Sequence, residues 1–304
     1  MVMKRFEVRE ESMLPTLAPG EEFVATDSHP ATPGDVVVFP HPRREDFWLV
    51  KRLGRLDSDG TAWVESDNAE VPATDSRAFG AVPVADLMPK VERLDETTFH
   101  EAVALLATED EDLARTVASH GIPPFWRREP GFPTLVLLIL EQQVSLESGA
   151  AMYRRLIELL GDVTAARAVS AGESSLQEIG VTRQKATYLV GLADLVDSGE
   201  LDLDGLASLD RDEARTLLIG IKGIGPWTAD AYLLSALRFP DEFPVGDRAL
   251  QVGTQEVLGL ETDPSEAELE TLSEPWRPVR AAAARLIWHA YLEKRGRREP
   301  EEVL

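Results

Sequence analysis

The chain contains no cysteine among its 304 residues. Disulfide bonds, zinc sites built on thiolates and iron–sulfur clusters all need cysteine, so the sequence excludes each of them. The five histidines show no metal-ligand spacing with one another. We therefore expect no metal site and no cofactor, and any chemistry must come from ordinary side chains.

Long apolar stretches are also lacking. No run approaches the roughly 18–20 apolar residues that a membrane-spanning helix needs. The first residues, MVMKRFEVREES, are charged and lack the apolar centre of a signal peptide. We therefore expect a soluble protein of the cytoplasm that does not contact a membrane. A hydrophobic content of 43% is sufficient for ordinary globular cores, and the length suggests about two domains.

Positive charge is scarce: 31 Lys and Arg stand against 54 Asp and Glu, which gives a net charge of −23. Proteins that bind nucleic acids usually carry basic surfaces, because phosphates attract cations. Two explanations of the acidity stay open, namely a salt-rich cytoplasm in which acidic surfaces keep proteins soluble, or ordinary acidic drift in an arginine-biased genome. In either case, affinity for nucleic acid must come from a local patch and from backbone amides.

Two styles of sequence meet near residue 95. Before it, short β-branched and aromatic runs such as VVVF and FWLVKRL alternate with the turn signals APGE, TPGD and DSDG, which is typical of strands. After it, segments such as FHEAVALLA and AAAARLIWHAYLEK have the apolar spacing of helices. We therefore predict a multidomain protein, with an all-β domain over residues 1–94 and an all-α domain over residues 95–304.

The string LIGIKGIGPWTA at residues 218–229 joins an apolar stretch to a Gly-Ile-Gly turn and a new helix. Glycines permit backbone angles and close approaches that a Cβ atom would prevent, and the N–H groups at a helix N-terminus bind phosphate. A Gly-x-Gly turn alone is more often a plain connection between helices, but the longer string favours phosphate binding. The residues expected at the DNA backbone are Ile221, Gly223, Gly225 and Thr228.

Five segments carry a resemblance over roughly residues 97–295. They are FPTLVLLILEQQVS, GVTRQKATYLVGLA, the hairpin string, FPVGDRALQ and WRPVRAAAARLIW. In this order they resemble the helix-hairpin-helix DNA glycosylase superfamily, in particular its DNA-3-methyladenine glycosylase II branch. The resemblance implies base-excision repair by hydrolysis of the N-glycosidic bond of alkylated purines, of the 3-methyladenine type, in double-stranded DNA.

Asp247 lies 20 residues after Trp227, and the resemblance implies that it faces the extruded nucleotide. Cleavage of the N-glycosidic bond builds positive charge on the sugar, which a fixed carboxylate stabilises while it orients or deprotonates water. An alkylated purine is already cationic and leaves without a strong acid, so one carboxylate suffices where ordinary glycosidases use two. Without the hairpin upstream, Asp247 reads as a helix N-cap.

Trp227 stands where superfamily members that also cut the strand carry a Schiff-base lysine, so the resemblance implies a monofunctional enzyme without lyase activity. Trp227 and Trp288 form the expected base pocket, because a cationic purine stacks well on an indole face. The alternative for both is core packing. Gln143 is expected to fill the gap left by the extruded base, with a buried amide that caps a loop as the alternative.

The β-rich part contains ESMLPTL, GDVVVF, VKRL, SDN and TDSRAFG, in order across residues 5–93. These motifs resemble the signal peptidase I family of Ser/Lys peptidases, in particular soluble members that mature nickel-type superoxide dismutases. The resemblance implies Ser12 as the nucleophile and Lys51 as a neutral general base. Ala73 replaces a serine that often positions this lysine, so either Thr74 substitutes for it or the protease is weakened.

The Ser/Lys mechanism sets conditions on the geometry. Ser12 and Lys51 must lie within hydrogen-bond reach, because the proton passes directly between them. Lys51 must be largely buried, since a solvated ammonium with a pKa near 10.4 stays protonated. Asp75 and Arg77 are expected to form a structural pair near this dyad.

Hypotheses of different classes remain open. In the first, a DNA glycosylase is fused to a Ser/Lys endopeptidase-like domain, and the partners are alkylated double-stranded DNA and a protein or peptide substrate. In the second, the chain is a Ser/Lys protease whose helical domain is only a DNA-binding module. Asp247 and the two pocket tryptophans favour the first. In a third, the β domain is an inactive adaptor, as Ala73 suggests.

Overall fold

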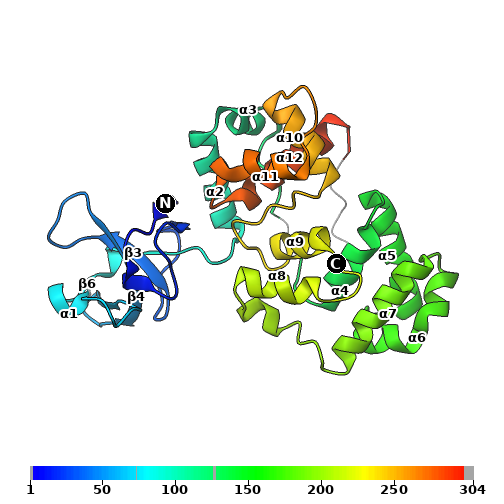
Figure 1. Cartoon of the computed structure of the whole chain (residues 1–304), viewed down its shortest axis with the longest axis horizontal. Helices are drawn as coiled ribbons and strands as arrows, with labels where there is room; N and C mark the ends of the chain where they lie inside the picture. Colours follow the sequence, from blue (N-terminus) through cyan, green and yellow to red (C-terminus); the bar gives the residue numbers. More distant parts are fainter. Residues whose placement is uncertain (1–2, 73, 126–127, 298–304) are drawn as a thin grey trace.

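The computed structural model describes residues 3–72, 74–125 and 128–297. Within these residues every strand lies between Lys4 and Pro89, and every helix of more than four residues lies beyond Asp95. Figure 1 shows the strand-rich part at one end of the molecule and the helices at the other. The predicted fold class, a β-rich domain followed by a helical domain, is confirmed.

The strand-rich part consists of two antiparallel sheets. In the smaller sheet, β1 (Lys4–Glu7) pairs with β2 (Glu22–Ala25). The larger sheet has the order β6-β5-β4-β3-β7. Its strands are β3 (Val36–Pro40), β4 (Trp48–Leu56), β5 (Thr61–Glu65), β6 (Val82–Pro83) and β7 (Met88–Pro89). The short helices of this part are η1 (Glu11–Met13), α1 (Ser76–Phe79) and η2 (Val84–Asp86).

Strand β4 carries a lysine into the interior. Successive side chains of a strand point to opposite faces, and along β4 the residues Leu49, Lys51 and Leu53 are all buried. Leu49 and Leu53 belong to the apolar core of the larger sheet. The alternation LVKRL therefore places Lys51 on the inward face, between two leucines.

The helices of the second part begin where the sequence offers a cap. The side chains of Asp95, Thr182 and Asp210 each accept an amide hydrogen bond in the first turn of α2, α7 and α8, which satisfies N–H groups that the helix leaves unpaired. The α-helices are α2 (Glu96–Glu109), α3 (Glu111–His120), α4 (Phe132–Glu141), α5 (Leu146–Leu160), α6 (Ala165–Glu178), α7 (Arg183–Asp197), α8 (Arg211–Ile219), α9 (Pro226–Ser235), α10 (Arg248–Leu258), α11 (Glu266–Ser273) and α12 (Arg280–Lys294). Two 3₁₀ turns, η3 (Gly205–Ser208) and η4 (Glu274–Trp276), lie among them.

These helices form two lobes, each with its own apolar core. The first lobe is built from α4 to α9, and its buried residues run from Phe132 to Phe239. The second is built from α2, α3, α10, α11 and α12 and contains Phe99, Trp276 and Ile287. Figure 1 shows the second lobe above the first. The chain crosses between the lobes after α3 and again after α9, so the segment that carries Asp247 follows a crossing.

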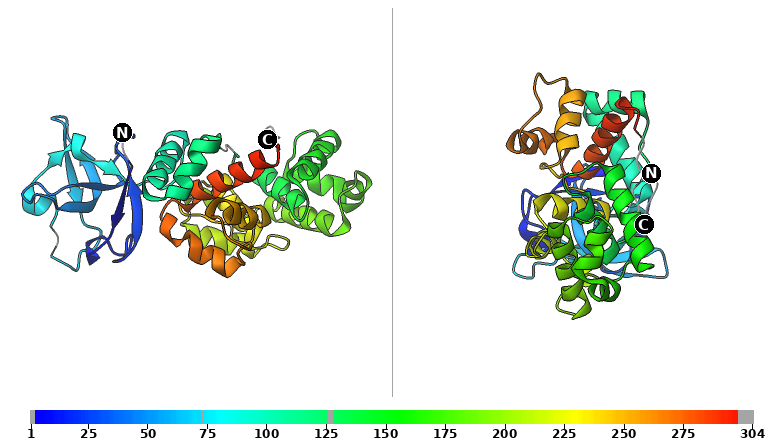
Figure 2. Two further views of the ribbon diagram at one scale, coloured as in Figure 1. Left: turned by 90° about the horizontal axis from the view of Figure 1, so that it is seen from above. Right: turned by 90° about the vertical axis from the view of Figure 1, so that its right-hand side faces the viewer.

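The β-rich part and the second lobe share a core. Met3 and Val24 belong to the same buried cluster as Phe99 on α2. Glu101, also on α2, accepts hydrogen bonds from the Thr26 hydroxyl at 2.5 Å and from the Ser28 hydroxyl. Figure 2 shows the helices of the second lobe directly beside the strands. Buried apolar contacts therefore join the two parts, in addition to the connecting chain.

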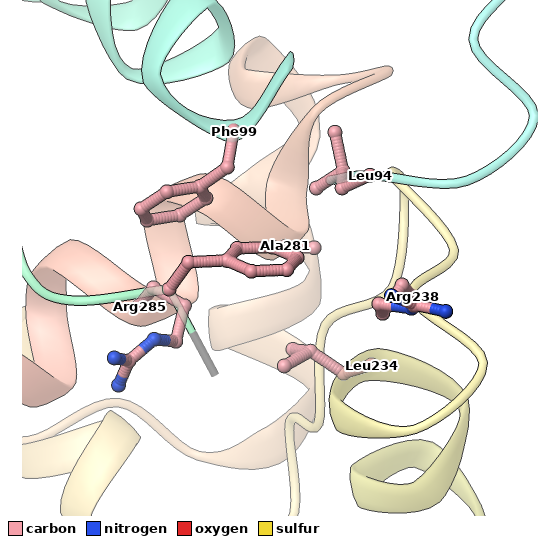
Figure 3. A pocket seen from close by; sticks show the side chains of 7 residues that line it. Leu94, Phe99, Leu234, Arg238, Ala281 and Arg285 are labelled. Atoms are coloured by element: carbon pink, nitrogen blue, oxygen red, sulfur yellow. The ribbon is translucent and has the colours of Figure 1, made fainter. Parts of the chain in front are cut away.

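A small cavity of about 20 Å³ lies between the start of the helical part, the end of α9 and α12. Figure 3 shows Leu94 and Phe99 reaching it from the start of the helical part and Leu234 from α9. This volume is close to the minimum that one water molecule needs, so no nucleobase fits.

Within residues 3–72, 74–125 and 128–297, no helix is both long and apolar enough to cross a membrane.

Candidate functional site

The hairpin between α8 and α9 presents the N-terminus of α9. Gly223 has a φ of +96°, and a Cβ atom at this position would lie only 2.3 Å from the Cγ atom of Tyr188. Gly225 is the N-cap of α9, is exposed, and offers no side chain to the first amides of the helix. Pro226 occupies the first position of α9, where its missing N–H is not needed. The turn therefore exposes a helix N-terminus with positive dipole character.

Two of the expected DNA-backbone residues have buried side chains. Ile221 is 7% exposed and Thr228 is 1% exposed. The Thr228 hydroxyl accepts a hydrogen bond from Gln142 at 3.0 Å. The side chains of Ile221 and Thr228 therefore pack inside the hairpin. The contact with DNA expected of these two residues would have to be made by their backbone groups.

Gln142 is a supporting residue that the sequence analysis did not single out. Its side-chain amide also donates to the carbonyl oxygen of Gly223 at 2.9 Å, so the end of α4 is tied to both sides of the hairpin turn. Lys185 on α7 in turn donates to the carbonyl oxygens of Leu140 and Gln142 at 2.7 and 2.8 Å. The paired glutamines of EQQVS were the available signal for this role.

Gln143 lies next to this bridge but points elsewhere. It is exposed and has a left-handed backbone with a φ of +57°, a conformation that non-glycine residues adopt rarely. A buried amide that caps a loop was the alternative for this residue, and its exposure contradicts that alternative. The buried bridge is made by Gln142 instead, which leaves the Gln143 side chain on the surface beside the hairpin.

Asp247 collects three hydrogen bonds on its carboxylate. The indole N–H of Trp227 donates to Oδ2 at 2.8 Å, and the indole N–H of Trp288 donates to Oδ1 at 2.9 Å. The backbone amide of Leu250 donates to Oδ1 at 2.8 Å, so Asp247 is also the N-cap of α10. Trp227 comes from α9 in the first lobe and Trp288 from α12 in the second, so both lobes fix one carboxylate.

The three hydrogen bonds fix the orientation of the Asp247 carboxylate and leave it able to accept one more hydrogen bond. An ionised carboxylate has about four lone-pair positions, and the three bonds leave room for one further donor such as water. Asp247 is half-buried, Trp227 is half-buried and Trp288 is 9% exposed. A fixed negative charge of this kind stabilises a developing cation without reorganisation. The N-cap and the catalytic reading of Asp247 are therefore compatible in one geometry.

The β-rich part brings Ser12 and Lys51 together. The Nζ atom of Lys51 donates to the Oγ atom of Ser12 at 2.8 Å. Ser12 is 9% exposed and Lys51 is 3% exposed. The pair borders a cavity of about 320 Å³, which is large enough to receive a side chain of a peptide. The remaining lining residues are Glu10, Glu11, His41, Arg44, Phe47, Leu49, Val71, Pro72 and Thr74.

The sequence motifs around the dyad hold its backbone. The amide of Asn68 donates to the carbonyl oxygen of Ser12 at 3.0 Å, and the Asn68 side chain donates to the carbonyl oxygen of Glu11 at 3.0 Å. Asp67 accepts hydrogen bonds from Arg52 and from the hydroxyl of Thr16. The SDN motif therefore fixes the turn that presents Ser12.

Asp75 and Arg77 form an ion pair at 2.5 Å, and Asp75 is fully buried. Burial alone would raise the pKa of Asp75, but the Arg77 guanidinium and the amides of Ser66 and Arg77 outweigh it and lower the pKa to about 2. Asp75 is therefore ionised at neutral pH, where it braces the chain near the dyad. Ala73 lies outside the described residues, and Thr74 is exposed at the rim of the cavity.

Burial lowers the pKa of Lys51 below its ordinary value, while the negative charges of Asp75, Glu10 and Asp67 oppose this shift. The net direction is downward, because desolvation penalises the ammonium more than these carboxylates favour it. A lowered pKa increases the fraction of neutral amine at a given pH. The short contact with Ser12 and the downward direction of this pKa shift are those expected of a general base.

Among the described residues, no group of three or more His, Asp and Glu side chains is placed to hold a metal ion.

Two protein-family models match separate parts of the chain. The model of HhH-GPD superfamily base excision DNA repair proteins matches residues 136–278, which include the hairpin and Asp247. The model of signal peptidases of the peptidase S26 type matches residues 1–59, which include Ser12 and Lys51. The helical part of the chain resembles the HhH-GPD superfamily, and the β-rich part resembles signal peptidases. Both resemblances inferred from sequence motifs are confirmed.

Individual relatives agree with the HhH-GPD match. The DNA-3-methyladenine glycosylase of Bacillus subtilis is 30% identical over 169 residues, which cover 52% of this chain and 56% of that protein. The chain thus spans little more than half of this curated relative. A structure of DNA-3-methyladenine glycosidase from Bacillus halodurans is 27% identical, with a TM-score of 0.54, and covers 62% of this chain and 88% of that one.

The fold of the helical part is also that of a yeast relative solved with DNA. The Schizosaccharomyces pombe 3-methyladenine DNA glycosylase in complex with abasic DNA has a TM-score of 0.58 at 24% identity. The match covers 62% of this chain and 95% of that one. The helical part therefore has the HhH-GPD glycosylase fold.

Proposed function

We propose that the helical part is a monofunctional DNA glycosylase that hydrolyses the N-glycosidic bond of alkylated purines in double-stranded DNA. The observation that carries this proposal is the carboxylate of Asp247, which Trp227 and Trp288 hold from two lobes beside an exposed hairpin. The relatives named for 3-methyladenine support the substrate class.

The reaction follows from the developing charge. As the bond from sugar to base breaks, the sugar approaches an oxocarbenium ion and the cationic base leaves as a neutral purine. Asp247 stabilises the sugar cation and accepts the proton of the attacking water. The indole N–H groups of Trp227 and Trp288 hold both carboxylate oxygens in place, so little reorganisation is needed when the charge appears.

The absence of strand cleavage follows from the residue at position 227. A lyase step needs an amine that attacks the sugar carbon, and the indole of Trp227 has none. Its N–H already binds Asp247 at 2.8 Å. Lys222 lies before the turn and is exposed, away from the position that a nucleophile would need in α9. The product is therefore an abasic site in an intact strand.

Extrusion of the damaged base requires a pocket that receives the base and a side chain that fills the gap left in the duplex. Trp227 and Trp288 are assigned to the base pocket, because an indole face suits a cationic purine and both indoles lie at the carboxylate of Asp247. Gln143, exposed beside the hairpin, is proposed to enter the duplex where the base has left. The hairpin amides near Gly225 hold a phosphate of the same strand.

The decisive experiment is release of 3-methyladenine from methylated duplex DNA. The purified chain should release the base without added metal or cofactor, and Asp247→Asn should slow the release by at least about 100-fold while DNA binding persists. Borohydride should trap no covalent adduct. Unchanged release by Asp247→Asn would remove the assignment of this residue, and a trapped adduct would contradict the monofunctional class.

A second function is favoured for the β-rich part. The 2.8 Å contact between Lys51 and Ser12, with both residues buried beside a cavity, supports a Ser/Lys endopeptidase. Lys51 takes the Ser12 proton as the hydroxyl attacks the peptide carbonyl, and returns it to the leaving amine. Hydrolysis of a peptide with a small residue at the cleavage point, abolished in Ser12→Ala, tests this function. No cleavage of any such peptide would favour the inactive-adaptor hypothesis.

A further inference from the structure

The first residue of α10, Arg248, is placed where a cation is unfavourable. It follows Asp247 directly and lies at the N-terminus of the helix, where the helix dipole is positive and favours anions. Its side chain is 66% exposed, so apolar packing does not explain its position. A guanidinium in this place suits a negatively charged ligand that arrives from outside.

In the structure, the guanidinium of Arg248 forms an ion pair with an acidic side chain of the protein itself. The Nη1 atom of Arg248 donates to Oδ2 of Asp263, which lies in the loop between α10 and α11 and is itself 39% exposed. The same nitrogen donates to Oε1 of Gln251 at 3.3 Å. Gln251 also donates to the carbonyl oxygen of Val245 at 3.2 Å, which ties Arg248 to the turn that precedes Asp247.

We propose that Arg248 binds a phosphate of the DNA strand that carries the damaged nucleotide, and that Asp263 holds its guanidinium until DNA replaces it. This inference rests on the proposed glycosylase function. A carboxylate that acts on the sugar of one nucleotide lies near the two phosphates that are attached to that sugar. Arg248, one residue from Asp247 on the exposed first turn of α10, is placed to reach one of them.

The exchange is physically reasonable because the resident pair is weak. Exposed ion pairs contribute little, since water and salt screen both charges. A phosphodiester of DNA carries the same single negative charge as Asp263, but it can accept two parallel hydrogen bonds from the guanidinium fork, whereas Asp263 accepts one from Nη1. In a chain with a net charge of −23, this exchange adds one local phosphate contact to the contact proposed for the hairpin amides.

The test measures binding and does not need base excision. The probe is a duplex with one tetrahydrofuran abasic analogue, titrated by fluorescence anisotropy at several salt concentrations. Arg248→Gln should weaken binding roughly threefold to tenfold and reduce the slope of log K against log salt by about 0.9, the loss of one phosphate contact. Asp263→Asn should tighten binding roughly twofold to fivefold, and the double variant should bind as Arg248→Gln does.

A matched ion pair gives the control. Arg115 and Asp112 on α3 form an ion pair with exposed fractions of 66% and 32%, so Arg115→Gln and Asp112→Asn change the same charges on the same lobe. These variants should leave the affinity and the salt slope within error of wild type.

An unchanged slope in Arg248→Gln, or weaker binding in Asp263→Asn, overturns the proposal even where wild type excises the base. Failure of wild type both to bind the probe and to release 3-methyladenine overturns the proposed function as well.

Discussion

The two sites of this molecule use opposite environments for their charged groups. Lys51 is buried in the sheet, and desolvation lowers its pKa so that it can serve as a base. Asp247 is half-buried and is held in place by three hydrogen bonds. A base must be made neutral before it works, whereas a carboxylate that stabilises a cation must stay charged and remain open to a large substrate.

The sites also differ in how the chain assembles them. The dyad is complete within the β-rich part, where strand alternation brings Lys51 to Ser12. Asp247 needs Trp227 from one lobe and Trp288 from the other. Perturbations of the larger sheet, which has its own core, should therefore act on the peptidase site alone, whereas a change in the packing of the lobes should disturb the carboxylate.

The largest expected effect concerns the buried base. Lys51→Met should lower peptide hydrolysis by about 100- to 10,000-fold, because Lys51 is the lysine among the described residues that line this cavity. In the wild type, the rate should rise with pH, since the neutral amine is the active form, and its midpoint should fall below the ordinary lysine value of 10.5. Lys90→Met, which removes an ion pair with Glu92 at 2.6 Å, is the control. Full activity in Lys51→Met would end the assignment of Lys51 as the general base.

The next effect concerns the two indole donors of Asp247. Trp227→Phe and Trp288→Phe keep an aromatic face but remove one N–H each, so the rate of base release should fall about 10- to 100-fold with little change in DNA affinity. Single-turnover kinetics and binding titrations separate these quantities.

Trp276 provides the matched control for those substitutions. Its buried indole donates to Oδ2 of Asp110, the N-cap of α3, at 2.8 Å. Trp276→Phe should therefore lower stability but leave the rate of base release unchanged. Equal loss of rate in all three tryptophan variants would show that the effect is general loosening of the helical part.

Substitutions at the two hairpin glycines should have different effects, one on the stability of the fold and the other on DNA binding. Gly223→Ala should lower the free energy of unfolding by about 2–3 kcal/mol, because the residue has a φ of +96° and its Cβ atom would meet Tyr188. Gly225 has a φ of −90° and open space around it, so Gly225→Val should fold and instead weaken DNA binding. Denaturant unfolding and anisotropy measure the two effects, and normal binding by Gly225→Val would place DNA away from this turn.

The smallest expected effect is on acid stability. Asp75 has a folded-state pKa of about 2, below the ordinary value of 3.8. Its contribution to stability is therefore present above pH 4 and lost as the pH falls toward 2. We expect about 1–2 kcal/mol, reduced by the 58% exposure of the Arg77 side chain. Urea unfolding between pH 2.5 and 5 should show this loss in wild type and a flatter profile in Asp75→Asn.

Linear motifs pointed to most of the residues proposed for both sites, because they fix residue type and order together. Lys51 could be placed inward from the alternation of LVKRL, and its contact with Ser12 follows from the mechanism. The roles of neighbouring glutamines could not be separated in the same way. Gln142 turns into the hairpin and Gln143 turns out, and this choice depends on the left-handed backbone at the end of α4.

Contacts between distant segments were not accessible from the sequence. Stacking was expected of Trp227 and Trp288, but their shared hydrogen bonding to Asp247 depends on the relative position of two lobes. Met3 and Val24 have the pattern of ordinary strand residues, yet they pack into the core of the second helical lobe. Neither arrangement leaves a periodic signal in the chain, since it is set by the shape of the partner surface.

Asp247 and Ser12 can be tested against each other in one full-length protein. Release of 3-methyladenine and hydrolysis of a peptide are measured for wild type, Asp247→Asn and Ser12→Ala. The account predicts that Asp247→Asn loses base release by at least about 100-fold and keeps peptide hydrolysis, and that Ser12→Ala does the reverse. Base release that is unaffected by Asp247→Asn would contradict the central claim that this carboxylate, held by two tryptophans, drives excision.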